Sequence, residues 1–205
     1  GHVESDPDAG AGLVMLHWGP LPRVPTLDNA DSVLEGVNGP GAQSFAGAAI
    51  ANVGDADGDG ADDLAIFSPM EDSGGTDRGA VYLWRSPYPE YASLEDAWAR
   101  WTEIREGSGT VAAMADFDIA IVGDPSGDGD PDIIVTTGLG NSSEGGQAWY
   151  LPSQPGPGVT PVREIGWQIM KTGEDQWRQF GACDSAGDID RDGIEDWIVS
   201  VRHLD

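Results

Sequence analysis

Short apolar runs recur along the chain, and turns rich in glycine and aspartate separate them. Runs of β-branched and aromatic residues occur at 64–67, 80–84, 133–137 and 147–151. Such runs, bounded by glycine, proline and aspartate, are typical of β-strands joined by tight turns. The content of 30 Gly and 14 Pro fits the same arrangement, so the pattern predicts an all-β chain.

One unit of this pattern occurs three times. Each copy has a small or apolar stretch, an Asp-rich loop and an apolar strand, and a second strand follows in the first two copies. The loops begin at Asp55, Asp124 and Asp188, which are 69 (124 − 55) and 64 (188 − 124) residues apart. This period is long enough for a four-stranded propeller blade with a sizeable loop.

The two ends of the chain are out of phase with this unit. The strand-like segment 12–18 has no Asp-rich loop before it, and the strand at 197–201 follows the last loop. Joining end to start gives (205 − 188) + 55 = 72 residues, close to the other two periods. We therefore predict a β-propeller of four-stranded antiparallel blades with three blade equivalents. It forms one region over 1–205 with units at about 12–79, 80–146 and 147–205, and the strand at 12–18 completes a blade begun at 174–205.

One stretch has the apolar spacing of a helix. Ser93 is a capping residue, and Leu94, Ala97, Trp98 and Trp101 follow at i, i+3, i+4 and i+7. A loop between two strands explains the segment equally well. Residues 26–28 begin the equivalent segment of the first unit.

The three Asp-rich loops have the spacing of a calcium site. Carboxylates at alternate positions turn toward one point as the chain curls around a hard cation, and Gly at position 6 permits the sharp bend. Position 7 can add its backbone carbonyl oxygen, whatever its side chain. We predict about three Ca²⁺ per chain, held by Asp55, Asp57, Asp59, Ala61 and Asp63; by Asp124, Ser126, Asp128, Asp130 and Asp132; and by Asp188, Asp190, Asp192, Ile194 and Asp196.

Turn formation alone, a different metal or an EF-hand fits these loops less well. Asp-Gly pairs also form ordinary turns, but three copies in one register argue for more than turn formation. Zinc prefers His and Cys, which the loops lack, and magnesium prefers fewer protein ligands. An EF-hand loop is longer, ends in Glu at position 12 and lies between helices.

The loop motif resembles the FG-GAP repeats of the integrin α-subunit propeller and its bacterial relatives. The resemblance rests on the loop, the glycine before it, the apolar strand after it and the Phe180-Gly181 pair; Phe45-Ala46 and Phe117-Asp118 depart from Phe-Gly. It implies four-stranded blades, with calcium in the loop between a blade's first two strands. In that family the ions are usually structural, and ligands bind elsewhere on the propeller.

Propellers of this family have more than three blades. The chain is then either a fragment of a longer protein or a subunit of an assembly. A homodimer of two three-blade chains would close a six-blade ring and cover the exposed sheet edges.

Charge narrows the list of partners. The chain has 36 Asp and Glu against 10 Lys and Arg, for a formal net charge of −26. Nucleic acid and anionic membrane surfaces are therefore unfavourable partners, and no apolar stretch is long enough to insert in a membrane. Of the 36 acids, 14 lie inside the three loops, so a general acidic surface does not explain their placement.

No catalytic constellation stands out, so we expect that the chain is not an enzyme. His2, His17 and His203 are scattered, and Cys183, the only cysteine, lies among small residues as a buried apolar side chain would. Tryptophans could form a carbohydrate platform, although packing between blades is the other use for them. The four considered are Trp84, Trp98, Trp101 and Trp149.

Three functions remain open. The leading one is a calcium-binding module for recognition, adhesion or scaffolding, which binds a protein or glycan outside the cell or at its surface. Millimolar external calcium can fill weak sites there. The alternatives are a non-catalytic accessory domain of a secreted hydrolase or lyase and a purely structural, self-assembling unit.

Overall fold

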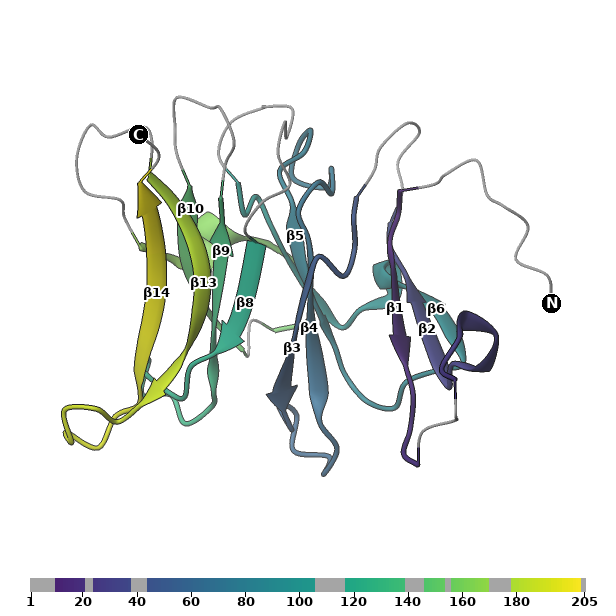
Figure 1. Cartoon of the computed structure of the whole chain (residues 1–205), viewed down its shortest axis with the longest axis horizontal. Helices are drawn as coiled ribbons and strands as arrows, with labels where there is room; N and C mark the ends of the chain where they lie inside the picture. The colour runs from purple at the N-terminus through teal and green to yellow at the C-terminus, as the bar shows by residue number, and fades with distance from the viewer. Residues whose placement is uncertain are drawn as a thin grey trace.

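The chain is all-β and contains several antiparallel sheets, as expected for a β-propeller fragment (Figure 1). No helix in the described part of the chain is long and apolar enough to cross a membrane. The computed structural model describes residues 10–20, 24–37, 44–105, 117–138, 146–153, 156–169 and 178–203.

The strands follow one another with short helical turns between some of them. The helical turns are η1 (Leu27–Asn29), η2 (Leu94–Asp96) and α1 (Val162–Ile165). The strands are β1 (Leu13–Leu16), β2 (Ser32–Glu35), β3 (Ala49–Gly54), β4 (Asp63–Ser68), β5 (Ala80–Trp84), β6 (Tyr91–Ser93), β7 (Ala99–Thr102), β8 (Phe117–Ile121), β9 (Asp132–Thr137), β10 (Gln147–Pro152), β11 (Gly158–Pro161), β12 (Trp167–Ile169), β13 (Arg178–Gly187) and β14 (Asp196–His203).

The strands form four sheets, which we name by their place in the chain. The N-terminal sheet has the order β1-β2-β6, and the first central sheet β11-β7-β5-β4-β3. The second central sheet has the order β12-β10-β9-β8, and the C-terminal sheet is the pair β13-β14. In Figure 1 the C-terminal sheet and the N-terminal sheet lie at opposite ends of the row, with the central sheets between them.

Both central sheets share one connectivity. Their strands β3-β4-β5-β7 and β8-β9-β10-β12 pair antiparallel in chain order. The connection from the third to the fourth strand crosses to the preceding sheet, where β6 pairs parallel with β2 and β11 pairs parallel with β7. The expectation of purely antiparallel sheets misses these parallel edge strands, because no sequence pattern marks a connection that joins a neighbouring sheet.

Apolar side chains fill the space between adjacent sheets. Successive residues of a strand point to opposite faces, so Ile66 faces the N-terminal sheet while Ala65 and Phe67 face the second central sheet. A further cluster, with Ile134 and Cys183 among its members, joins the second central sheet to the C-terminal sheet. Each central sheet is therefore covered on both faces, which explains its nearly continuous apolar strands.

The four tryptophans considered for a carbohydrate platform pack in this core instead. Trp101 and Trp149 lie between the two central sheets, where Trp98 packs against the same cluster. Trp84 is buried between the N-terminal and first central sheets. The indole nitrogen of Trp149 donates a hydrogen bond of 2.7 Å to the carbonyl of Ile104, so its one polar group is satisfied inside the core.

The segment with helical spacing is a short turn followed by a strand. Only Leu94–Asp96 is helical, as the 3₁₀ turn η2, and the Ser93 hydroxyl accepts a hydrogen bond from the amide of Glu95. Leu94 and Trp101 are both buried, but in different clusters on opposite sides of the sheet. The spacing thus reflects two separate contacts. The equivalent segment expected at residues 26–28 is the turn η1.

The unit boundaries inferred from the sequence fall where the third strand of a central sheet begins, counted in chain order. The units that start at 12, 80 and 147 begin next to β1 or at the first residues of β5 and β10. Among the described residues, no pairing joins β1 or β2 to β13 or β14. Within one chain, the N-terminal strand therefore does not complete the C-terminal sheet, since the two lie at opposite ends of the row (Figure 1).

The hairpins β3-β4, β8-β9 and β13-β14 turn through the Asp-rich loops, whose fourth residues adopt left-handed backbone conformations. These residues are Gly58 (φ 78°), Gly127 (φ 75°) and Arg191 (φ 66°). Glycine adopts this conformation freely, whereas a side chain with a Cβ is strained in it. The third loop therefore carries backbone strain that the other two avoid.

We expect Arg191→Gly to raise the free energy of unfolding by about 1 kcal/mol relative to Arg191→Ala. Gly58→Ala should lower the free energy of unfolding by about 1–2 kcal/mol relative to the parent protein. Urea unfolding in calcium-free buffer with a chelator measures both changes. Arg191→Ala is the matched control, because it removes the side chain and charge but keeps the Cβ. Equal stability of Arg191→Gly and Arg191→Ala would contradict the assignment of strain.

Candidate calcium centres

The three Asp-rich loops occupy the same place in the fold. We call them the first loop (55–63), the second loop (124–132) and the third loop (188–196), and number their positions 1 to 9. Each connects the first two strands of its sheet, which is the place that the resemblance implied for calcium. The three predicted sites therefore rest on equivalent hairpins.

The carboxylate at position 1 organises each loop through backbone amides. In the first loop, Asp55 Oδ1 accepts a hydrogen bond from the amide of Asp59 and Asp55 Oδ2 accepts one from the amide of Gly60, both at 2.9 Å. Asp124 and Asp188 bind the amides at positions 5 and 6 of their own loops at 2.8–3.0 Å. The sequence repeat is thus a repeat of hydrogen bonds as well.

Positions 5 and 9 also bind backbone amides. Asp59 accepts a 2.8 Å hydrogen bond from the amide of Ala61, and Asp63 accepts one of 3.0 Å from the amide of Ala56. The third loop repeats both contacts. Its position 7 amide donates to the position 5 carboxylate and its position 2 amide donates to the position 9 carboxylate, each at 2.8 Å. The loop is closed because position 9, at the start of the outgoing strand, reaches back to its beginning.

Three carboxylates converge in the first loop and three in the third. One oxygen each of Asp55, Asp57 and Asp63 lies within 4.8 Å of the others, and positions 1, 3 and 9 of the third loop form the same group. In the second loop position 3 is Ser126, which replaces the third carboxylate with a hydroxyl. The position 5 carboxylates lie outside these groups, and the role of these carboxylates and of the position 7 carbonyl oxygens as ligands stays a prediction.

The carboxylate at position 9 is the most buried of each group. Asp63 and Asp132 are both inaccessible to solvent, and burial raises the pKa of each. Asp132 Oδ2 accepts hydrogen bonds from the Ser126 amide at 3.1 Å and from the Tyr150 hydroxyl. Asp132 Oδ1 is buried and has no hydrogen-bond partner among the described residues. A bound cation would compensate such an oxygen, so the donor set of the second loop fits a metal ion.

Two carboxylates that are less buried, Asp59 and Asp124, show the opposite effect. Hydrogen bonds from the Ser86 hydroxyl and the Ala61 amide hold the pKa of Asp59 below its usual value. Desolvation raises the pKa of Asp124, but hydrogen bonds from the amides of Gly129 and Gly127 and from neighbouring groups outweigh it and lower the pKa overall. The loop amides thus favour the ionised carboxylates that a cation requires.

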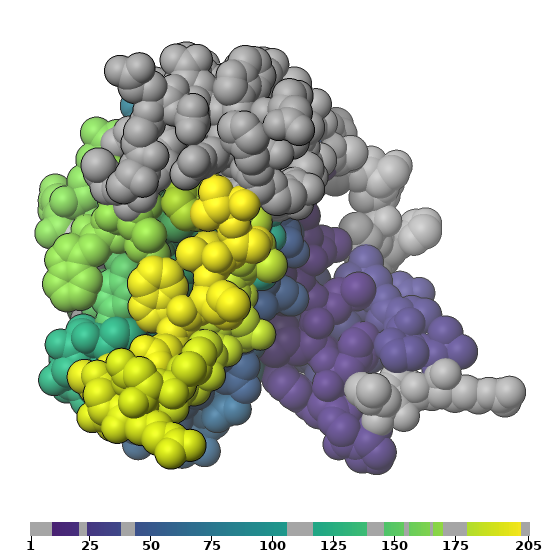
Figure 2. Space-filling view, turned by 60° about the vertical axis from the view of Figure 1, so that its left-hand side comes forward, coloured from purple at the N-terminus to yellow at the C-terminus, as the bar shows by residue number. Residues whose placement is uncertain are grey.

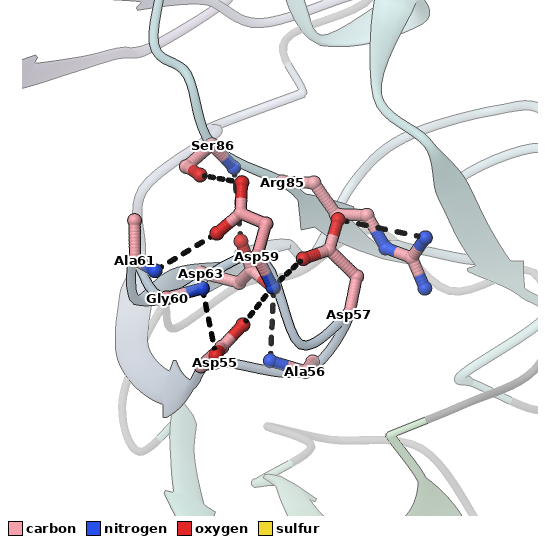
Figure 3. A network of polar contacts seen from close by, with 9 residues as sticks. All are labelled: Asp55, Ala56, Asp57, Asp59, Gly60, Ala61, Asp63, Arg85 and Ser86. Carbon is pink, nitrogen blue, oxygen red and sulfur yellow. Dashed lines mark hydrogen bonds and ion pairs between the residues drawn. The ribbon is translucent and has the colours of Figure 1, made fainter.

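Residues after the third strand also contact the first loop (Figure 3), and sequence reasoning missed them. The Ser86 amide donates to Asp63 Oδ1 at 2.9 Å, and its hydroxyl donates to Asp59 Oδ2 at 2.7 Å. The Arg85 guanidinium lies 3.8 Å from Asp57 and stacks over the ring of Trp98. A comparison of 80–89 with 13–22, which share prolines at equivalent places, would have drawn attention to this segment.

The comparisons with known proteins agree with this geometry in one segment. The FG-GAP repeat family matches residues 46–84, which span β3, the first loop, β4 and β5. A search of curated proteins found no match. FG-GAP repeats are β-propeller modules that are often found in extracellular and adhesion proteins. Residues 46–84 therefore match the FG-GAP repeat family, and the second and third loops repeat the hydrogen bonds of the loop in that segment.

Proposed function

We propose that this chain is a calcium-binding module of a β-propeller, built of four-stranded blades, that serves recognition, adhesion or scaffolding outside the cell. One observation carries the proposal: three equivalent hairpins present the same hydrogen-bonded Asp-rich loop, and two of these loops gather three carboxylates within 4.8 Å. The calcium ions are structural, and about three bind per chain.

The chemistry of the donors favours calcium. The predicted ligands are carboxylate, hydroxyl and carbonyl oxygens, and Ca²⁺ takes six to eight such ligands in flexible geometry. Asp55 and Asp63 come from opposite ends of the loop, so an ion bound to both ties the two strands of the hairpin together. The carboxylates repel one another without a cation, so calcium relieves a repulsion that the fold imposes.

The extracellular setting follows from the expected affinity. Calcium-binding modules of extracellular proteins commonly have dissociation constants of about 0.1–1 mM, and millimolar external calcium fills such sites. The net charge of −26 supports a soluble, calcium-rich setting and disfavours polyanionic partners. The ligand is then a protein or glycan that contacts a surface of the propeller outside the loops.

We propose a non-catalytic role. The thiol of Cys183 is buried, and burial raises its pKa to about 12, so it stays protonated at neutral pH and is a poor nucleophile. The carboxylates that converge most closely belong to the loops assigned to calcium. These observations support a binding module.

Calcium should stabilise the fold strongly. A site filled at about 100 times its dissociation constant adds about 2.7 kcal/mol to the free energy of unfolding, so three independent sites add roughly 8 kcal/mol. Thermal unfolding with excess EDTA and then with millimolar calcium measures the shift, and titration calorimetry counts the ions. No shift and no binding would mean that the loops are only Asp-Gly turns.

Removal of one converging carboxylate should weaken one site. We expect Asp57→Asn to lower calcium affinity of the first loop on the order of tenfold, equivalent to about 1.4 kcal/mol, because one charged ligand is lost. Asp96→Asn is the matched control: it removes the same charge from an exposed position outside the loops. Calorimetry on both variants decides whether the effect is local, and equal weakening would point to general electrostatic attraction instead.

A further inference from the structure

The third loop touches the second loop, and Glu195 makes the contact. Glu195 is position 8 of the third loop, and Gly123 is the residue directly before the second loop. A Cβ at Gly123 would lie 2.5 Å from the Cβ of Glu195 and closer still to its Oε2, so a larger residue would not fit while Glu195 keeps its place. In Figure 2 the lower end of the C-terminal hairpin, in yellow, lies beside teal residues of the second central sheet.

Gly123 is joined to both ends of the second loop. It precedes Asp124, the carboxylate at position 1, and its carbonyl oxygen accepts a 2.6 Å hydrogen bond from the amide of Asp132 at position 9. The amide of Val122 donates in turn to the carbonyl of Asp132 at 2.9 Å. A side chain packed on Gly123 therefore acts where the first and last carboxylates of the loop are held together.

The first and third loops each contain a side-chain bridge to position 8. In the first loop, Asn52 accepts a hydrogen bond from the amide of Gly54 and donates one to the carboxylate of Asp62, both at 2.7 Å. In the third loop, Ser185 accepts a hydrogen bond of 3.3 Å from the amide of the residue before position 1 and donates to the carboxylate of Glu195. Both loops thus hold their own entrance through a polar side chain.

The second loop lacks this bridge. Its residues at the two bridge positions are Ile121 and Pro131, whose side chains have no polar atom. Glu195 of the third loop occupies the space beside the entrance instead. No atom of the described residues lies within 4 Å of a Cβ built at Gly54, the corresponding residue before the first loop. The contact between loops is therefore a feature of the second and third loops and does not extend to the first.

We propose that Glu195 is a positioning residue of the second loop and couples calcium binding at the second and third loops, so that an ion in one raises the affinity of the other. This inference rests on the proposed function, because it concerns the same calcium sites. An ion held by positions 1, 3 and 9 of the third loop fixes Asp196, and with it the backbone of the adjacent Glu195.

The coupling follows from conformational freedom. Once Glu195 is fixed, it holds Gly123 in place, so the second loop has less freedom to lose when it binds its own ion. The effect is reciprocal, because an ion that changes the affinity of a second site has its own affinity changed by the same factor. The second and third loops should therefore fill together and the first loop independently.

Calcium titrations read by NMR test the coupling one loop at a time. The position 6 amide of each loop donates to the position 1 carboxylate, so the signals of Gly60, Gly129 and Gly193 report their own loops separately. Glu195→Ala should raise the midpoint calcium concentration of Gly129 about fivefold, a typical size for coupled sites, and leave that of Gly60 unchanged. Asp62→Ala is the matched control: it removes the position 8 carboxylate of the first loop and should leave the Gly129 midpoint unchanged.

Two further variants separate contact from charge. Glu195→Gln keeps the side chain over Gly123 and can still accept the hydrogen bond from Ser185, so the Gly129 midpoint should stay close to that of the parent protein. Asp190→Asn weakens the third site but leaves Glu195 in the chain, and it should raise the Gly129 midpoint. Equal weakening by Glu195→Gln and Glu195→Ala would reveal a general charge effect and overturn the positioning role. An unchanged Gly129 midpoint in Glu195→Ala or in Asp190→Asn would overturn the coupling.

Glycine substitutions test the contact from the other side. Gly123 (φ 56°) and Gly54 (φ 70°) both have left-handed backbone conformations before their loops, so an added Cβ strains both. Only at Gly123 does the Cβ displace Glu195. Gly123→Ala should therefore raise the midpoint of Gly193 as well as that of its own loop, whereas Gly54→Ala should affect Gly60 alone.

The same titrations distinguish the two levels of inference. An unchanged Gly193 midpoint in Gly123→Ala, with calcium still bound by all three loops of the parent protein, would overturn the coupling and leave the proposed function intact. If none of the three glycine signals of the parent protein responds to millimolar calcium, the proposed function and the coupling are both wrong.

Discussion

The fold depends on apolar contact between the faces of adjacent sheets. The central sheets bury both faces, since alternate residues of each strand belong to different clusters: Ile66 contacts the N-terminal side while Phe67 contacts the second central sheet. A sheet that needs cover on both faces cannot be stable alone, so each unit requires a neighbour. The same requirement leaves the first and last sheets with apolar faces such as that around Ile198.

The Asp-rich loops are a local solution placed on this scaffold. Amides at positions 5 and 6 bind the first carboxylate, and the last carboxylate reaches back to the start of the loop, so the conformation is fixed largely by hydrogen bonds inside the loop. The buried carboxylates at position 9 connect the loop to the core, because burial of Asp63 and Asp132 depends on the strands behind them. Asp132 Oδ1, buried and without a hydrogen-bond partner among the described residues, is an oxygen that a bound cation would compensate.

The contacts from the third strand link loop and sheet further. Ser86 binds two carboxylates of the first loop, and Tyr150 binds Asp132 of the second. Each central sheet therefore supports its loop with donors from its third strand or from the residues just after it, which are distant from the loop in sequence.

The sequence by itself determined the all-β class, the three loops and the strand positions around them, because alternation, turn residues and carboxylate spacing are local properties. It also indicated that Cys183 is a buried apolar side chain, as found. Only the tertiary structure decided that Leu94 and Trp101 pack in different clusters and that β6 and β11 pair with strands of the preceding sheet. It also decided that Ser86 and Tyr150 donate hydrogen bonds to the loop carboxylates. These are contacts between segments far apart in the chain, and no local pattern specifies which surfaces meet.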